Sequence, residues 1–220
     1  ILLKNDGVLP IKKGTKIAVI GPHADSLRYP VSGYTYPAYI EMMDAGRKNS
    51  AAVTFNGIAD EQAKAEKEKA PKGPFDTLFD MLDEEDVKQL DDMNGVLRTL
   101  HTRSLKEVLS DRFETVYAQG CDIIGTSEDG FSDVVKAANE SDVVVMALGG
   151  NCGWVNVTGG EGKDRQSLEL PGVQEKLLET VAATGKPVVL VLWTGNFFCE
   201  LGSRKYRRNC SGMDAGTICR

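Results

Sequence analysis

The chain contains 220 residues, of which 41% are hydrophobic and 26% are charged, and its formal net charge at pH 7 is -6. This composition is typical of one well-buried globular domain or two small ones, and it indicates neither a disordered chain nor a fibre. The negative charge argues against a nucleic-acid partner, because phosphate binding needs clustered Lys and Arg on one face. No apolar run approaches the roughly 20 residues that span a bilayer, so we expect no membrane partner.

The N-terminal sequence ILLKNDGVLP has no initiator Met, no basic n-region and no signal cleavage site. We therefore expect the chain to be the interior of a longer protein. These residues leave its localisation unknown, with a secreted or periplasmic protein slightly favoured over a cytoplasmic one.

The possible metal ligands of Cys and His type are few and scattered. They are Cys121, Cys152, Cys199, Cys210 and Cys219, with His23 and His101. Zinc ligands occur at recognisable spacings that this chain lacks, so we expect no metal and no cofactor. The odd number of cysteines favours free thiols over a disulfide framework.

Short apolar runs that end in glycine recur along the chain. The first covers residues 16–22 (KIAVIGP), and such a run is typical of a strand buried on both faces of a parallel sheet. Residues 114–118 (ETVYA) form a weaker candidate. The signature returns at residues 141–150 (SDVVVMALGG) and 186–195 (KPVVLVLWTG), both rich in β-branched residues.

Helical patterns lie between these runs, at residues 104–113, 131–139 and 172–184. The last pattern is entered by Pro171 and closed by Gly185, as expected at helix ends. Strands that alternate with helices indicate βαβ units. We therefore predict an α/β fold, a mostly parallel sheet flanked by helices on both faces, which is an α/β sandwich.

Residues 58–92 break this alternation. The segment is dense in Lys, Glu and Asp, and it carries Pro71, Gly73 and Pro74. A solvated charged insertion with one short helix is the favoured interpretation, and a segment that binds a partner is the alternative.

Ligands of open parallel sheets bind at the carboxyl ends of the strands, so the loops that follow the apolar runs are candidate sites. After the first run, Gly21 is followed by Pro22 and no second glycine arrives in register, which argues against a dinucleotide-binding loop. His23 is more typical of a buried, hydrogen-bonded imidazole than of a catalyst. Asp25 and Ser26 are expected to cap or turn the chain.

The loop after the third run contains the sequence TGGEGKDR. Glu161 lies between two glycines, so a flexible backbone can present its carboxyl group to a leaving-group oxygen in a cleft. Lys163 and Asp164 are expected to face solvent or to pair locally. An ordinary glycine-rich turn remains the alternative at this point.

Several blocks, in this order and spacing, resemble the C-terminal domain of glycoside hydrolase family 3. They are ILLKNDGVLPI, KIAVIGPHAD followed by SGYTYP, VYAQGCDI, AANESDVVVMALG, GGEGKDRQSLELPGVQ and GKPVVLVLWTG. The resemblance covers residues 1–196, with the charged insertion at 58–92 as its least family-like part. The family contains exo-acting β-glucosidases and β-xylosidases.

This resemblance implies a two-domain hydrolase that acts on β-linked oligosaccharides or glycosides. An N-terminal TIM-like barrel, which lies outside this chain, would carry the aspartate nucleophile. Glu161 matches the general acid/base of the family's GEGxDR-like motif, while Asp164 and Arg165 match the pair that would shape the loop. Without the barrel the chain is expected to be inactive. A non-catalytic module that binds carbohydrate or another subunit is the alternative.

Residues 197–220 depart from the family pattern. When permitted codons for Arg204 to Arg220 are read from the second base of the first codon, they can encode GNTAAIVQAWMPGQYA, which resembles the family at this place. The Trp of that peptide is forced, because Met213 has one codon and the codon of Asp214 begins with G. We therefore predict a frame slip near Gly202, which would leave the α/β sandwich incomplete at the C-terminus.

Overall fold

A computed structural model describes residues 2–31, 33–48, 88, 92–153, 157–159, 169–193 and 213–214. The chain divides into two compact units. The first comprises Ile1–Ser26, Arg103–Gly150 and Ser167–Arg220, and the second comprises Leu27–Thr102 and Asn151–Gln166. Within the described ranges, no helix has both the length and the apolar character needed to cross a membrane.

The first unit is built on a parallel sheet with the strand order β2-β1-β3-β4-β5. The strands are β1 (Lys16–Ile20), β2 (Glu114–Ala118), β3 (Val143–Gly149), β4 (Val188–Trp193) and β5 (Met213–Asp214). The first four occupy the predicted apolar runs and confirm the predicted α/β class. β5 adds a two-residue pairing to β4, with Met213 opposite Val188.

The central strands are apolar throughout because both of their faces are buried. In β1, Ala18 and Ile20 belong to one hydrophobic cluster, whereas Ile17 and Val19 belong to a second cluster on the other face. All four side chains are fully buried. Since successive strand residues point to opposite faces, a strand covered on both sides needs apolar residues at every position.

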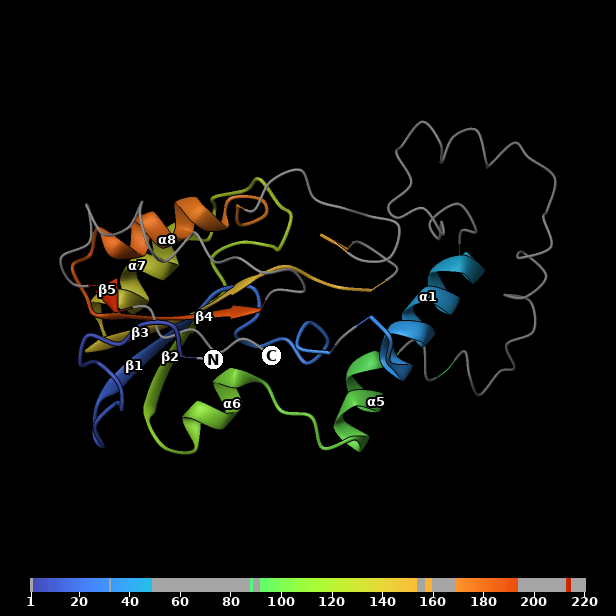
Figure 1. Ribbon diagram of the computed structural model, residues 1–220, viewed down its shortest axis with the longest axis horizontal. Helices are drawn as coiled ribbons and strands as arrows, with labels where there is room; N and C mark the ends of the chain where they lie inside the picture. The colour runs from blue at the N-terminus through green and yellow to red at the C-terminus, as the bar shows by residue number, and fades with distance from the viewer. Residues whose placement is uncertain are drawn as a thin grey trace. The chain divides into compact units, whose positions relative to one another are not determined.

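Helices α7 (Phe131–Asn139) and α8 (Gln174–Ala182) cover one face of the sheet, and α6 (Leu105–Ser110) lies on the other (Figure 1). α8 buries Leu177, Leu178 and Val181, which lie at the helical spacing of a single face. The three helices lie within the predicted ranges, and the sandwich has helices on both faces as predicted.

The opposite face is closed by α6 and by residues near the N-terminus. Leu105 and Leu109 of α6 pack against the cluster formed by β1, β3 and β4, and Val8, Leu9 and Ile11 join them. The N-terminal segment therefore contributes to the core of the first unit.

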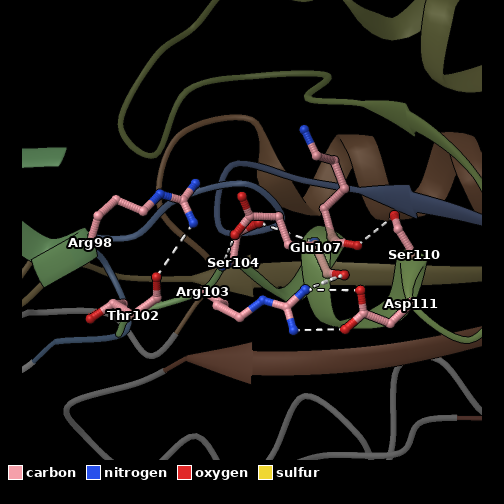
Figure 2. Close-up of polar contacts among 8 residues, drawn as sticks. Arg98, Thr102, Arg103, Ser104, Glu107, Ser110 and Asp111 are labelled. Carbon is pink, nitrogen blue, oxygen red and sulfur yellow. Dashed lines mark hydrogen bonds and ion pairs between the residues drawn. The ribbon is translucent and has the colours of Figure 1, made fainter. Parts of the chain in front are cut away.

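Ser104 begins α6 with a capping box, shown in Figure 2. The Ser104 hydroxyl accepts from the Glu107 amide at 3.2 Å, and the Glu107 carboxylate accepts from the Ser104 amide at 2.9 Å. These two bonds satisfy backbone donors that the first helical turn leaves without a partner. The helix start is therefore set by this local pair.

The described part of the second unit contains two helices that the sequence did not predict. They are α1 (Tyr36–Lys48) and α5 (Met93–Thr99), which contact each other. α1 buries Ala38, Ile40 and Met43, and α5 buries Leu97. Of the predicted charged insertion at 58–92, only residues 88 and 92 lie within the described ranges, so its character stays a prediction.

Candidate functional site at the carboxyl end of the sheet

His23 lies directly beyond β1 and is fully buried. Its Nε2 is 2.8 Å from the backbone oxygen of Gly150, and its ring stacks on Trp193 with centroids 5.7 Å apart. Burial lowers the pKa of His23 to about 4, although the hydrogen bond to Gly150 opposes this shift. His23 is therefore a neutral imidazole at pH 7 that donates to the end of β3, as expected for a structural histidine.

The chain leaves β3 through a backbone conformation that requires glycine. Gly149 has φ of +144°, and a Cβ atom at this position would lie 1.8 Å from the backbone oxygen of Trp193. The next amide, that of Gly150, donates to the same oxygen at 2.9 Å. The ends of β3 and β4 are thus locked together where the candidate loop begins.

Gln174, in the first turn of α8, forms hydrogen bonds with the backbone at the end of β3. Its side-chain oxygen accepts from the Gly149 amide at 2.8 Å, and its Nε2 donates to the oxygens of Gly149 at 2.8 Å and Ile123 at 3.0 Å. The side chain is fully buried. We did not single out Gln174 from the sequence, although a polar residue at the apolar spacing of Leu177, Leu178 and Val181 is a usable signal of such a role.

In the second unit, the first residues of the loop after β3, 151–152, pair with residues 158–159 of the same loop. The Asn151 amide donates to the Thr158 hydroxyl at 2.9 Å, and the Thr158 amide donates to the Asn151 oxygen at 3.0 Å. Cys152 and Gly159 form an isolated parallel bridge. Residues 151–152 and 158–159 of this loop are therefore held side by side, and Gly159 stands two residues before Glu161 in the sequence.

Arg28 contacts the start of the same loop. Its Nη2 donates to the Cys152 oxygen at 3.3 Å and to the Glu41 carboxylate at 2.8 Å, and its Nη1 donates to the Val31 oxygen at 2.8 Å. A further bond joins Nε to the same Glu41 oxygen at 3.1 Å. Only 9% of the Arg28 side chain is exposed, so this ion pair is largely shielded from water.

Two glycines allow the backbones around Arg28 to approach closely. A Cβ at Gly33 would lie 3.2 Å from Cys152 Sγ and from Gly153 Cα, and a Cβ at Gly153 would lie 2.6 Å from Arg28 Nη2. Burial raises the pKa of the Glu41 carboxyl group, while Arg28 counteracts the rise. The pair is thus a compact junction between residues 28–41 and the loop start.

In the first unit, Asp25 ties the segment after β1 to α6. It accepts from the Ser104 hydroxyl at 2.8 Å and forms an ion pair with Lys106. The Lys106 ammonium also lies 4.7 Å from the centre of the Tyr117 ring. Asp25 therefore forms tertiary contacts with α6, at residues 79 and 81 positions away, instead of the expected local cap or turn.

A family model described as the glycosyl hydrolase family 3 C-terminal domain matches residues 1–201 of the chain. The chain therefore belongs to glycosyl hydrolase family 3. This membership confirms the resemblance drawn from the sequence blocks. The matched range ends one residue before Gly202, and the predicted frame slip stays a prediction.

Named relatives of this family 3 domain include xylosidases and glucosidases. A β-xylosidase of Formosa agariphila is 43% identical over 91 residues, which are 41% of this chain and 12% of that protein. A periplasmic β-glucosidase of Salmonella typhimurium is 28% identical over 197 residues, which are 89% of this chain and 20% of that protein. The chain thus spans 12% to 20% of the length of these two relatives.

Solved structures share the fold. A family 3 exo-β-xylosidase in complex with a xylobiose aziridine activity-based probe matches 99% of this chain and 20% of that chain, with 21% identity and a TM-score of 0.57. A β-glucosidase from Listeria innocua in complex with glucose matches 98% of this chain and 21% of that chain, with 22% identity and a TM-score of 0.55. At these identities the likeness establishes the architecture.

The predicted site residues of this family 3 domain, Glu161, Asp164 and Arg165, lie outside the described residues. The structure brings together the residues that precede them, at the bridge between Cys152 and Gly159. Among the described residues, no group of three His, Cys, Asp or Glu side chains could hold a metal ion. Cys121 and Cys152 are free thiols, and burial, followed by the charge of Asp122, raises the pKa of Cys121 to about 12.

Proposed function

We propose that this chain is the acid/base-bearing domain of a retaining exo-β-glycosidase and that Glu161 is the acid/base. One observation carries the proposal on the structural side: the loop after β3 is closed by the Asn151–Thr158 bonds and the Cys152–Gly159 bridge, immediately before the glycines that flank Glu161. Family membership supports the same role. Asp164 and Arg165 would shape the loop around the acid.

The substrate class follows from the names of the relatives. They are described as β-xylosidases, exo-1,4-β-xylosidases and a β-glucosidase. We therefore propose that the whole protein removes terminal xylose or glucose from β-linked oligosaccharides or glycosides. An N-terminal barrel in the same protein would hold the sugar and supply an aspartate nucleophile.

The first step forms a covalent intermediate. The barrel carboxylate attacks the anomeric carbon, the bond from that carbon to the leaving oxygen breaks, and Glu161 gives its proton to that oxygen. The two carboxyl groups of a retaining enzyme stand about 5 to 5.5 Å apart, which places one on each side of the reacting carbon. Glu161 must be protonated at this stage, which a nearby carboxylate and a water-poor cleft favour.

The second step releases the sugar. Glu161, now ionised, takes a proton from water as the water oxygen attacks the anomeric carbon, and the bond to the nucleophile breaks. The free sugar leaves with its original anomeric configuration, and both carboxyl groups return to their starting protonation states. The glycines beside Glu161 would let the loop deliver the acid to the barrel.

The test compares the full-length parent protein with its Glu161→Ala variant on aryl β-xylosides and β-glucosides. We expect kcat/KM to fall by about 100-fold or more for a glycoside with a poor leaving group. The fall in kcat/KM should be far smaller for a dinitrophenyl glycoside, because dinitrophenolate leaves without being protonated. Azide should restore kcat on activated substrates, because it replaces the water that Glu161 would activate. Glu169→Ala is the control, since Glu169 is an exposed acid eight residues after Glu161 in the sequence.

Equal rates in wild type and Glu161→Ala on both substrates would place the acid elsewhere. Absence of hydrolysis by the wild-type parent, combined with calorimetric binding of xylo-oligosaccharides, would instead support a non-catalytic carbohydrate-binding module.

A further inference from the structure

We propose that Arg28 and Glu41 form a positioning pair that fixes the start of the loop on which Glu161 is carried. This inference rests on the proposed role of Glu161, but the contacts that carry it all lie among described residues. Arg28 is joined to Glu41 on one side and to the Cys152 oxygen on the other. The pair therefore links α1 to the loop start.

The contacts of Arg28 lead through Cys152 to Gly159, two residues before the acid in the sequence. The Cys152 oxygen accepts from Arg28, and Cys152 forms an isolated β-bridge with Gly159. Its neighbour Asn151 forms two hydrogen bonds with Thr158. Gly160 alone separates Gly159 from Glu161 in the sequence. A shift of the Cys152 carbonyl would therefore also shift Gly159, which stands two residues before the acid in the sequence.

The geometry of the pair suits positioning better than general stabilisation. Arg28 uses all three of its guanidinium nitrogens and reaches three separate acceptor groups, on Glu41, Val31 and Cys152. A planar guanidinium group with several hydrogen bonds fixes both the orientation and the distance of its acceptors, whereas a lysine ammonium group does not fix their orientation. Because the pair is largely buried, removal of one partner leaves a charge without compensation.

The chain offers a matched control pair. Arg103 donates to both carboxylate oxygens of Asp111, at 2.7 and 3.0 Å, as Figure 2 shows. These side chains are 47% and 56% exposed and flank the two ends of α6 in the first unit. Exposed ion pairs contribute little to stability, so Arg103→Lys tests the loss of an arginine fork in the first unit.

Three variants of the full-length parent perturb the positioning pair differently. Arg28→Lys keeps the charge and loses the fork, while Glu41→Gln keeps the size and loses the charge. Gly153→Ala leaves both side chains intact but places a methyl group 2.6 Å from the present position of Arg28 Nη2, so the guanidinium must move. All three should disturb the same contact to Cys152.

The measured quantity is the ratio of kcat/KM for a dinitrophenyl glycoside to kcat/KM for an alkyl glycoside. A displaced acid slows only the substrate that needs protonation, so we expect each variant to raise this ratio by about tenfold or more. A loss of folded enzyme lowers both values equally and leaves the ratio unchanged. Arg103→Lys should also leave the ratio unchanged.

The variants are then combined with Glu161→Ala. If the pair acts through Glu161, Arg28→Lys should add no further change in the ratio once the acid is removed. The positioning inference alone would be overturned if the ratio were unchanged in all three single variants while Glu161→Ala raised it as expected. An unchanged ratio in Glu161→Ala itself would overturn the proposed acid, and the two failures are thus distinguishable.

Discussion

The side chain of Gln174 pairs with both backbone groups of Gly149, accepting from its amide and donating to its oxygen, each at 2.8 Å. Gln174 opens α8 and Gly149 ends β3, so the pair connects the helix layer to the carboxyl end of the central strand, where the candidate loop begins. An amide group is the natural partner here, because it combines one acceptor with two donors and can satisfy a neighbouring peptide in both directions.

Replacement of Gln174 by Leu should destabilise the chain strongly. The change would leave the Gly149 amide and the oxygens of Gly149 and Ile123 without this buried partner, and each buried group left unpaired costs about 1–3 kcal/mol. We expect the free energy of unfolding, measured by urea denaturation, to fall by more than about 2 kcal/mol. The exposed Gln119→Leu serves as the control, and similar losses in the two variants would contradict this account.

Gly149→Ala should be far more damaging than Gly185→Ala. Both glycines have positive φ, +144° and +72° respectively, but the added methyl group would overlap the Trp193 oxygen at Gly149 and meets nothing within 4 Å at Gly185. Gly185→Ala should therefore cost only the left-handed backbone penalty of about 1–2 kcal/mol. Thermal unfolding of both variants measures the difference. Equal melting temperatures would contradict this expectation, because they would show that the backbone around Gly149 and Trp193 accommodates the methyl group without extra cost.

Stability should fall as the pH drops below about 6.5, because of His23. Burial lowers its pKa from 6.5 to about 4 in the folded chain, so between these values the unfolded chain binds a proton that the folded chain does not. The contribution is fully present above pH 6.5, decreases toward pH 4 and amounts to roughly 3 kcal/mol at most. The measurement is the free energy of unfolding between pH 4 and pH 8.

His23→Asn supplies the matching variant, since an amide can still donate toward Gly150 and does not titrate. It should reduce the slope of stability against pH in this window, whereas the exposed His101→Asn should keep the wild-type slope. An identical slope in the wild type and His23→Asn would assign the pH dependence to other groups.

The elements that the sequence predicted are those whose burial is visible locally. β1 and α7 follow from a continuous apolar run and a helical spacing, and glycine or proline lies next to their ends. α1 and α5 were not predicted, because neither shows a clear apolar face by itself. The two helices contact each other but are separated by more than 40 residues of chain, between Lys48 and Met93, so the pattern is not local.

The same distinction applies to the candidate site. Glu161 was found because the family motif surrounds it in the sequence, whereas Arg28 and Gln174 act on backbone groups 124 and 25 residues away. A backbone carbonyl has no sequence signature, so contacts to it require coordinates. A buried position for an otherwise polar residue is the remaining clue, and it applies to Gln174 among the apolar residues of α8.

Resequencing of the gene across codons 202–220 should reveal a frame slip near Gly202. The altered frame would place the Trp of AIVQAW across the codons of Met213 and Asp214, where β5 pairs with β4 in this structure. A β-branched, apolar strand at that edge would cover more of β4 than the present two-residue pairing does. The chain with the restored frame should therefore melt at a higher temperature and aggregate less than the present chain. An intact present frame in the gene, or a restored chain of lower stability, would refute the slip.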